Sequence, residues 1–288
     1  MTPGYFFNNI EQRGDTMDHI EPCCCFDSSL YTGTPDREST EKAFDVPQVI
    51  AELDGLYNGG REAEAESFIC KHRDKARACG DWRAELSMLS ELMGHYRRDR
   101  NEKAGLEAVW QGLELIKEHR LGQTVSGATV MLNAATTLKC FGRPEESVKI
   151  FCHASRVYSD NLDPKDYRFA GLYNNMALSY ADIGEYEQAE KYFKMAIRIM
   201  EGCNEPGNEI AVTLCNMAEM YSKIHHSDPR IAKCMEQAWE LLNAPQLKKD
   251  GYHAFTISKC APTFDYFGYF LWAGELKNRA EEIYAGNR

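Results

Sequence analysis

The chain has 288 residues, of which 43% are hydrophobic and 27% charged, and its formal net charge is −11 at pH 7. This composition is typical of a soluble globular protein, and the acidic balance argues against general binding to nucleic-acid backbones or to anionic membrane surfaces. No apolar run is long enough to predict a membrane span, and the N-terminus lacks the basic and apolar regions of a secretory signal. The odd number of cysteines, 11, predicts reduced thiols in a cytoplasmic protein.

Residues 1–45 differ from the rest of the sequence because they are rich in glycine and proline and show no sustained helical period. We interpret them as an irregular N-terminal extension and residues 46–288 as one helical domain. Whether the extension occupies a binding groove of that domain, as an internal ligand, is left open.

A weaker helical unit opens the domain, and the first unit of the regular series follows it. Residues 47–79 predict a pair of helices with a break at Gly59 and Gly60, and a second unit opens at residues 92–96 and closes near Trp110.

The clearest unit spans residues 172–197. It combines small residues, large aromatic residues and one turn glycine at helical spacing: Ala177, Ala189 and Ala196; Tyr180, Tyr186 and Phe193; and Gly184. Two antiparallel helices can approach closely only where a small residue faces a large one, so this pattern predicts a tightly packed helical hairpin.

The small residue of the first helix recurs through the chain. It lies at Gly94, Ala135, Ala177 and Ala218, in steps of 41, 42 and 41 residues. A fixed period of this kind indicates a repeat array. We therefore expect an all-α solenoid of five to six helix–turn–helix repeats, arranged as one right-handed superhelix.

The last unit is less regular. We expect Pro262 to start or kink its first helix. We interpret the aromatic run at residues 264–272 as core, with a docking patch as the alternative.

The unit at residues 172–197 resembles the tetratricopeptide repeat position for position. The step near 42 residues exceeds the common spacing of about 34, and the segment Leu-Tyr-Asn-Asn-Met-Ala at residues 172–177 is similar to the long repeats of kinesin light chains. The chain as a whole also resembles uncharacterised bacterial tetratricopeptide proteins. These resemblances imply a fold and do not by themselves supply a function.

Asparagines form the candidate binding site. Asn133, Asn175 and Asn216 each lie two residues before the small position of a first helix, so one amide recurs per repeat. An amide both donates and accepts hydrogen bonds, which matches an extended peptide backbone. The kinesin light chain resemblance implies that such asparagines contact a cargo peptide. The alternative is that they bridge adjacent helices or cap local backbone.

Helical spacing places further side chains on the same stripe. The predicted peptide-binding set is Asn133, Asn174, Asn175, Asn216, Thr129, Thr136, Lys139, Leu178, Asp182, Glu219, Lys223, His95 and Arg98. Chaperone co-factor repeats that grip a C-terminal carboxylate carry lysine and arginine at fixed groove positions. Thr129, Leu132, Gly171, Val212 and Cys215 stand at those places here, which argues against such a clamp and for recognition of an extended segment.

No motif predicts catalysis, a cofactor or a metal site. The adjacent Cys23, Cys24 and Cys25, even with His253 and Cys260, lack the ligand spacing of zinc sites. We expect a non-catalytic scaffold that binds a protein or peptide, with no nucleic-acid or membrane partner, and self-association is left open. A peptide-sensing regulator, whose groove binds a short signalling peptide, is the alternative, and an enzyme is the third reading.

Overall fold

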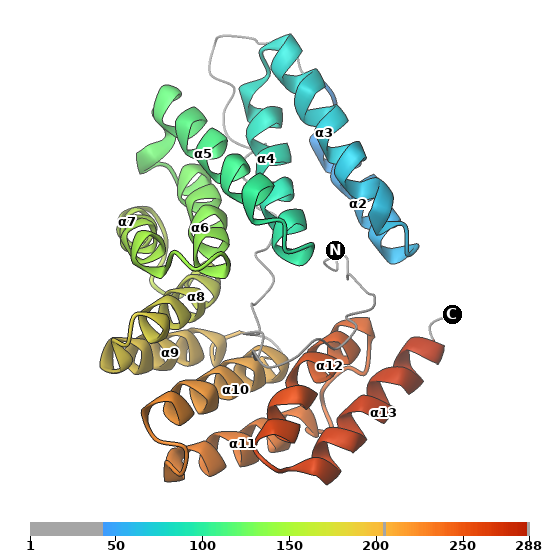
Figure 1. Ribbon diagram of the computed structural model, residues 1–288, viewed down its shortest axis with the longest axis vertical. Coiled ribbons are helices and arrows are strands. Elements are labelled where there is room, and N and C mark those ends of the chain that lie inside the picture. The colour runs from blue at the N-terminus through green and yellow to red at the C-terminus, as the bar shows by residue number, and fades with distance from the viewer. Residues whose placement is uncertain (1–42, 204–205, 287–288) are drawn as a thin grey trace. The chain divides into compact units, whose positions relative to one another are not determined.

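The computed structural model describes residues 43–203 and 206–286 (Figure 1). Most of the expected N-terminal extension, with Cys23, Cys24 and Cys25, lies outside these residues, so its boundary near residue 45 remains a prediction. The described part of the chain contains helices and turns and no strand. The expectation of an all-α fold is confirmed.

The described residues form two compact units, one ending at Pro164 and the other beginning at Lys165. The helices of the first unit are α2 (Val46–Asn58), α3 (Glu62–Cys79), α4 (Trp82–Arg98), α5 (Glu102–Glu118), a 3₁₀ turn η1 (Leu121–Gln123), α6 (Val125–Cys140) and α7 (Pro144–Asn161). Those of the second are α8 (Arg168–Asp182), α9 (Tyr186–Met200), α10 (Gly207–Ile224), α11 (Pro229–Leu242), α12 (Gly251–Tyr266) and α13 (Phe270–Gly286).

Consecutive helices pack as hairpins in both units, as Figure 1 shows for α6 with α7 and for α12 with α13. Within the first unit α4 also contacts α6, and within the second α10 contacts both α8 and α12. The first helices of successive hairpins are therefore neighbours inside each unit, which is the packing expected of stacked repeats.

The turns inside the hairpins explain where the repeat needs glycine. Gly60, Gly142, Gly184 and Gly268 have φ of 68°, 73°, 80° and 85°. A residue with a Cβ is strained in this left-handed region, and glycine is not. The α4–α5 turn uses Arg100 at the same place, with φ 55°, so one hairpin of the series has a strained turn.

Side chains fix many of the helix starts. An aspartate, asparagine or threonine accepts a hydrogen bond from the first turn of six helices, and these caps are Asp45, Asp81, Asn101, Thr124, Asp228 and Asp250. Such caps satisfy backbone donors that have no partner within the helix.

The small-residue register is confirmed at three of its four positions. Ala135, Ala177 and Ala218 are each fully buried. Gly94 is different, because a Cβ built there would meet only the Arg97 guanidinium, at 3.9 Å. Close packing against a partner helix does not require a glycine at that position.

Two expectations for the last hairpin are corrected in part. Helix α12 begins at Gly251, behind the Asp250 cap, so Pro262 lies inside the helix and does not start it. The aromatic run is only partly core: Phe264 is fully buried, whereas Phe270 and Leu271 are 68% and 88% exposed. The turn at residues 267–269 divides the run between α12 and α13, so the run does not lie along one buried helix face.

Candidate functional site

The amide of Asn133 joins two first helices of the first unit. Its Nδ2 donates to Ser90 Oγ at 2.7 Å, from α6 to α4. Its Oδ1 is buried and has no hydrogen-bond partner in the part of the chain that the structure describes. The Nδ2 of Asn133 therefore holds α6 against α4, whereas its Oδ1 takes no part in that contact.

The second unit brings Asn174 and Asn216 together. The Oδ1 of Asn174 accepts from Thr213 Oγ1 at 3.1 Å and from Asn216 Nδ2 at 3.5 Å, which ties α8 to α10. Its Nδ2 is buried and finds no acceptor among the described residues. The register argument placed Asn175 in the series; in the structure both Asn174 and Asn175 are at most 1% exposed.

The threonines and the lysine of the predicted set in α6 are mostly buried. Thr129 Oγ1 lies 2.7 Å from the Tyr158 hydroxyl and donates to Val125 O at 3.0 Å. Thr136 is fully buried and donates to its own helix, and Lys139 is 7% exposed. These side chains support packing within the α6–α7 hairpin.

His95 and Arg98 tie α4 to α2 through Tyr57. His95 Nδ1 lies 2.9 Å from the Tyr57 hydroxyl, and the Arg98 guanidinium lies over the Tyr57 ring, 3.9 Å from its centroid. Burial lowers the pKa of His95, which disfavours its charged form, and burial raises the pKa of Tyr57 to about 12. Arg98 is exposed, whereas His95 is 2% exposed.

Glu91 stands on the same helix and was missed by sequence reasoning. Burial, and then the charge of Asp54, raise its pKa to about 7. A carboxyl with such a pKa titrates near neutrality. Its neighbours Asp54 and Tyr57 lie on α2, so we interpret Glu91 as part of the α2–α4 contact.

The predicted residues of α8 and α10 divide into buried and exposed members. Leu178 is 1% exposed, and Glu219 is 2% exposed and accepts from Thr263 Oγ1 of α12 at 2.8 Å. Lys223 donates to Asp182 Oδ1 at 3.0 Å, and both of these side chains are exposed.

Polar contacts between successive first helices recur at a nearly constant sequence separation. The pairs are Ser90–Asn133, Asn174–Asn216, Asp182–Lys223, Asn208–His253, Glu209–Tyr252 and Glu219–Thr263, separated by 41 to 45 residues. This separation is the repeat length itself. Looking one repeat away from Asn133 for a hydroxyl would have found Ser90, and looking one repeat away from Glu219 would have found Thr263.

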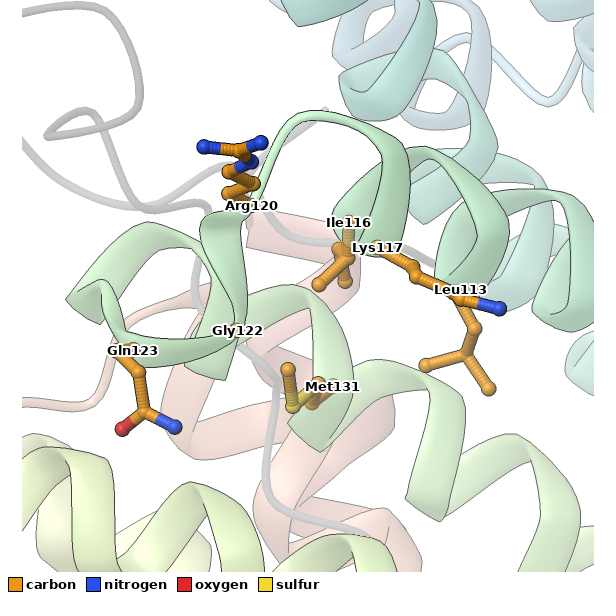
Figure 2. Close-up of a pocket in the computed structure, with 7 residues that line it drawn as sticks. All are labelled: Leu113, Ile116, Lys117, Arg120, Gly122, Gln123 and Met131. Atoms are coloured by element: carbon orange, nitrogen blue, oxygen red, sulfur yellow. The ribbon is translucent and has the colours of Figure 1, made fainter.

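A shallow hollow of about 370 Å³ lies between the end of α5, η1 and α6 (Figure 2). Ile116 and Met131, 3% and 7% exposed, provide its apolar part, and Lys117 and Arg120 stand at its rim (Figure 2). Its lining holds no carboxylate, thiol or hydroxyl, so the Lys117 amine has no acid–base or nucleophilic partner within it.

The described residues also provide no place for a metal ion. No three histidine, cysteine, aspartate or glutamate side chains come together among them. His253 Nδ1 instead lies 2.9 Å from Asn208 Oδ1, and burial lowers its pKa to about 4. None of the helices in this part of the chain combines the length and apolar character needed to cross a bilayer.

The match to a known family falls on the hairpin where the repeat pattern is clearest. Residues 168–229, which span α8, α9 and α10, match the tetratricopeptide repeat family. The chain contains tetratricopeptide repeats. Repeats of this family generally mediate protein–protein interactions and are generally not catalytic.

Three solved structures are similar to this chain, and two of them are described as containing such repeats. The kinesin light chain-like repeats of Podosopora anserina are 14% identical over 75% of this chain and 97% of theirs, with a TM-score of 0.50. BtubC (BKLC) from P. vanneervenii is 17% identical over 84% of this chain and 89% of its own, with a TM-score of 0.42. A tetratricopeptide repeat protein from Parabacteroides merdae is 13% identical over 82% of this chain and 98% of its own, with a TM-score of 0.40. At these identities the likeness concerns the fold alone.

Proposed function

We propose that this chain is a non-catalytic scaffold that binds an extended segment of a partner protein along the first helices of its tetratricopeptide repeats. The family supplies the general role, and the amides of α6, α8 and α10 supply the specific proposal. The asparagine series, Asn133 with Asn174, Asn175 and Asn216, is the part of that face that we expect to contact the partner backbone.

The observation that supports this proposal is that two buried amides each have one polar atom without a hydrogen-bond partner among the described residues. These atoms are the Oδ1 of Asn133 and the Nδ2 of Asn174. Buried polar groups are nearly always paired, so the acceptor in the first unit and the donor in the second each favour a ligand group that pairs with it. A peptide backbone carries one N–H and one C=O per residue and meets this requirement.

Exposed charges would add side-chain contacts. Arg98, Asp182 and Lys223 are the members of the predicted set that solvent reaches freely. The buried members, Asn174 above all, become accessible to a backbone only when neighbouring side chains shift. Binding is therefore expected to be accompanied by a local rearrangement of the α8–α10 contact.

The test separates a binding amide from a structural one. Full-length wild-type protein and variants are used to capture partners from the native cell lysate, and captured proteins are quantified by mass spectrometry. The double variant Asn133→Ala/Asn174→Ala removes the amides. The matched control Ser90→Ala/Thr213→Ala removes their helix-bridging hydroxyl partners and keeps both amides.

We expect a partner that wild type and the hydroxyl control retain and that the amide variant loses, by about tenfold or more, since orphaning polar groups of a bound backbone costs more than about 1.4 kcal/mol. Circular dichroism checks that all three proteins are folded. If both double variants lose the partner equally, or neither does, the amides only bridge helices and the proposal is wrong.

A further inference from the structure

We infer that the turn between α12 and α13 is a second docking surface, separate from the first-helix face, for a protein segment that presents an apolar side chain flanked by lysine or arginine. We define the turn patch as Tyr266, Phe270 and Leu271. It does not depend on the asparagine series.

The turn patch is the largest local concentration of exposed apolar side chains in the described residues. Tyr266, Phe270 and Leu271 are 54%, 68% and 88% exposed. Six large hydrophobic side chains are exposed in this part of the chain, and three of them fall within these six consecutive positions. Single exposed hydrophobic residues are common, whereas a contiguous group of them marks an interaction site.

A stacked aromatic cluster holds together the two helices and the turn that carry the patch. The rings of Trp239 and Trp272 stack at 4.7 Å with an interplanar angle of 6°, and Tyr269 stacks on Trp272 at 4.8 Å. Phe264, which is fully buried, meets Trp239 edge-on at 6.1 Å. A side chain that docks on a surface held in this way loses less binding energy to ordering than one that docks on a mobile loop.

Two exposed carboxylates lie on or near the turn that carries the patch. Asp265 precedes Tyr266, and Glu236 lies near Tyr269, whose pKa is raised by burial and then by the Glu236 charge. Both carboxylates are exposed and take part in no ion pair among the described residues. The nearest exposed cation along α13, Lys277, comes six residues after Leu271 and thus about 9 Å farther along the helix.

This arrangement favours a basic partner over a second copy of the chain. A symmetric contact through the patch would place Asp265 and Glu236 of one copy against the same residues of the other, and facing like charges oppose association. A segment with lysine or arginine beside an apolar residue would pair those carboxylates, and the net charge of −11 would steer it toward the protein.

The experiment uses the full chain and a fluorescein-labelled peptide, Gly-Ser-Lys-Leu-Lys-Phe-Lys-Gly, titrated by fluorescence anisotropy. Two comparison peptides replace the lysines with glutamates or the leucine and phenylalanine with serines. Binding of the first peptide is expected to weaken about tenfold or more in Phe270→Ser/Leu271→Ser and to weaken in Asp265→Asn/Glu236→Gln, as it would for contact residues.

Matched variants separate this surface from the rest of the molecule. Ile224→Ser removes another exposed hydrophobic residue, 44% exposed, and Asn133→Ala/Asn174→Ala removes the amides. Both are expected to bind the first peptide as wild type does. Substitutions at exposed positions leave the core intact, which circular dichroism verifies.

Three results would overturn the inference. The first is absence of binding at about 1 mM protein, which is weaker than any useful docking site. The second is equal binding of the lysine and glutamate peptides, or binding that Phe270→Ser/Leu271→Ser does not change. The third is wild-type dimerisation in analytical ultracentrifugation that the same double variant abolishes, because the patch would then be a self-interface.

Discussion

The hairpins α8–α9 and α12–α13 contain similar residues, but these residues differ in how far they are exposed. Both turn through a left-handed glycine, Gly184 at φ 80° and Gly268 at φ 85°. In α8–α9 the phenylalanine Phe193 is fully buried between helices. In α12–α13 the phenylalanine Phe270 begins a helix and is 68% exposed.

The difference teaches that register, and not hydrophobicity, decides which aromatic residues form the core of a repeat. In α8–α9 the aromatic residues of the repeat sit at defined offsets from small ones, so the full burial of Phe193 and the partial burial of Tyr180 and Tyr186 follow from the pattern. In α12–α13 the aromatic residues are consecutive, and helical geometry turns about 100° per residue. Some of them must therefore face solvent, whatever their hydrophobicity.

The largest expected effect comes from truncating one phenylalanine in each hairpin. Phe193→Ala should lower the free energy of unfolding by about 3–5 kcal/mol because it leaves a cavity in the core. Phe270→Ala should change it by about 0.5 kcal/mol or less. Urea denaturation followed by circular dichroism measures both. Similar values for the two variants would show that the hairpins do not differ in the way described.

Acidification should affect α12–α13 through a residue that α8–α9 lacks. His253 is 1% exposed, and its burial lowers the pKa to about 4 in the folded state. The unfolded chain binds the proton near its ordinary pKa of about 6.5, so stability is lost as the pH falls from there toward 4. The loss attributable to this group approaches about 3 kcal/mol below pH 4.

The comparison that isolates His253 is the pH profile of the free energy of unfolding for wild type and His253→Gln. Glu91 opposes the trend, since its raised pKa makes stability fall as the pH rises toward 7. Only the difference between the two profiles is therefore assigned to His253. A difference that does not vary between pH 7 and 4 would contradict the assignment.

A smaller effect is expected from the proline inside α12. Pro262 has no N–H to donate to the carbonyl of Ser258, whereas α8 carries no proline. Pro262→Ala should restore that hydrogen bond and raise the free energy of unfolding by about 1 kcal/mol, partly offset by the greater freedom of the unfolded chain. An unchanged or lower urea midpoint would show that the helix already accommodates the proline without cost.

Much of the fold follows from the sequence, because a repeat of small and large residues has few ways to pack. The positions of Ala135, Ala177 and Ala218, and the turn at Gly184, are where the pattern places them. The prediction that Phe270 lies in the core was wrong. It relied on hydrophobicity alone, in a segment where the regular spacing of small and large residues had already ended.

The candidate site was harder to derive than the fold. The spacing identified Asn133, Asn175 and Asn216, and it gave no reason to expect that Asn174, the neighbour of Asn175, accepts a hydrogen bond from Asn216. Neighbouring residues on a helix differ by about 100° in direction, and which of the two faces the next helix depends on how the helices cross. Glu219, expected on an open stripe, is buried against Thr263 for the same reason.

Hydrogen exchange read by mass spectrometry, on the full chain with and without the partner that the asparagine variant fails to capture, tests the central claim most directly. The account predicts new protection in the first helices α6, α8 and α10, with much less in α7, α9 and α11. Protection confined to those second helices, or to residues 266–271, would contradict it, because the partner would then bind elsewhere.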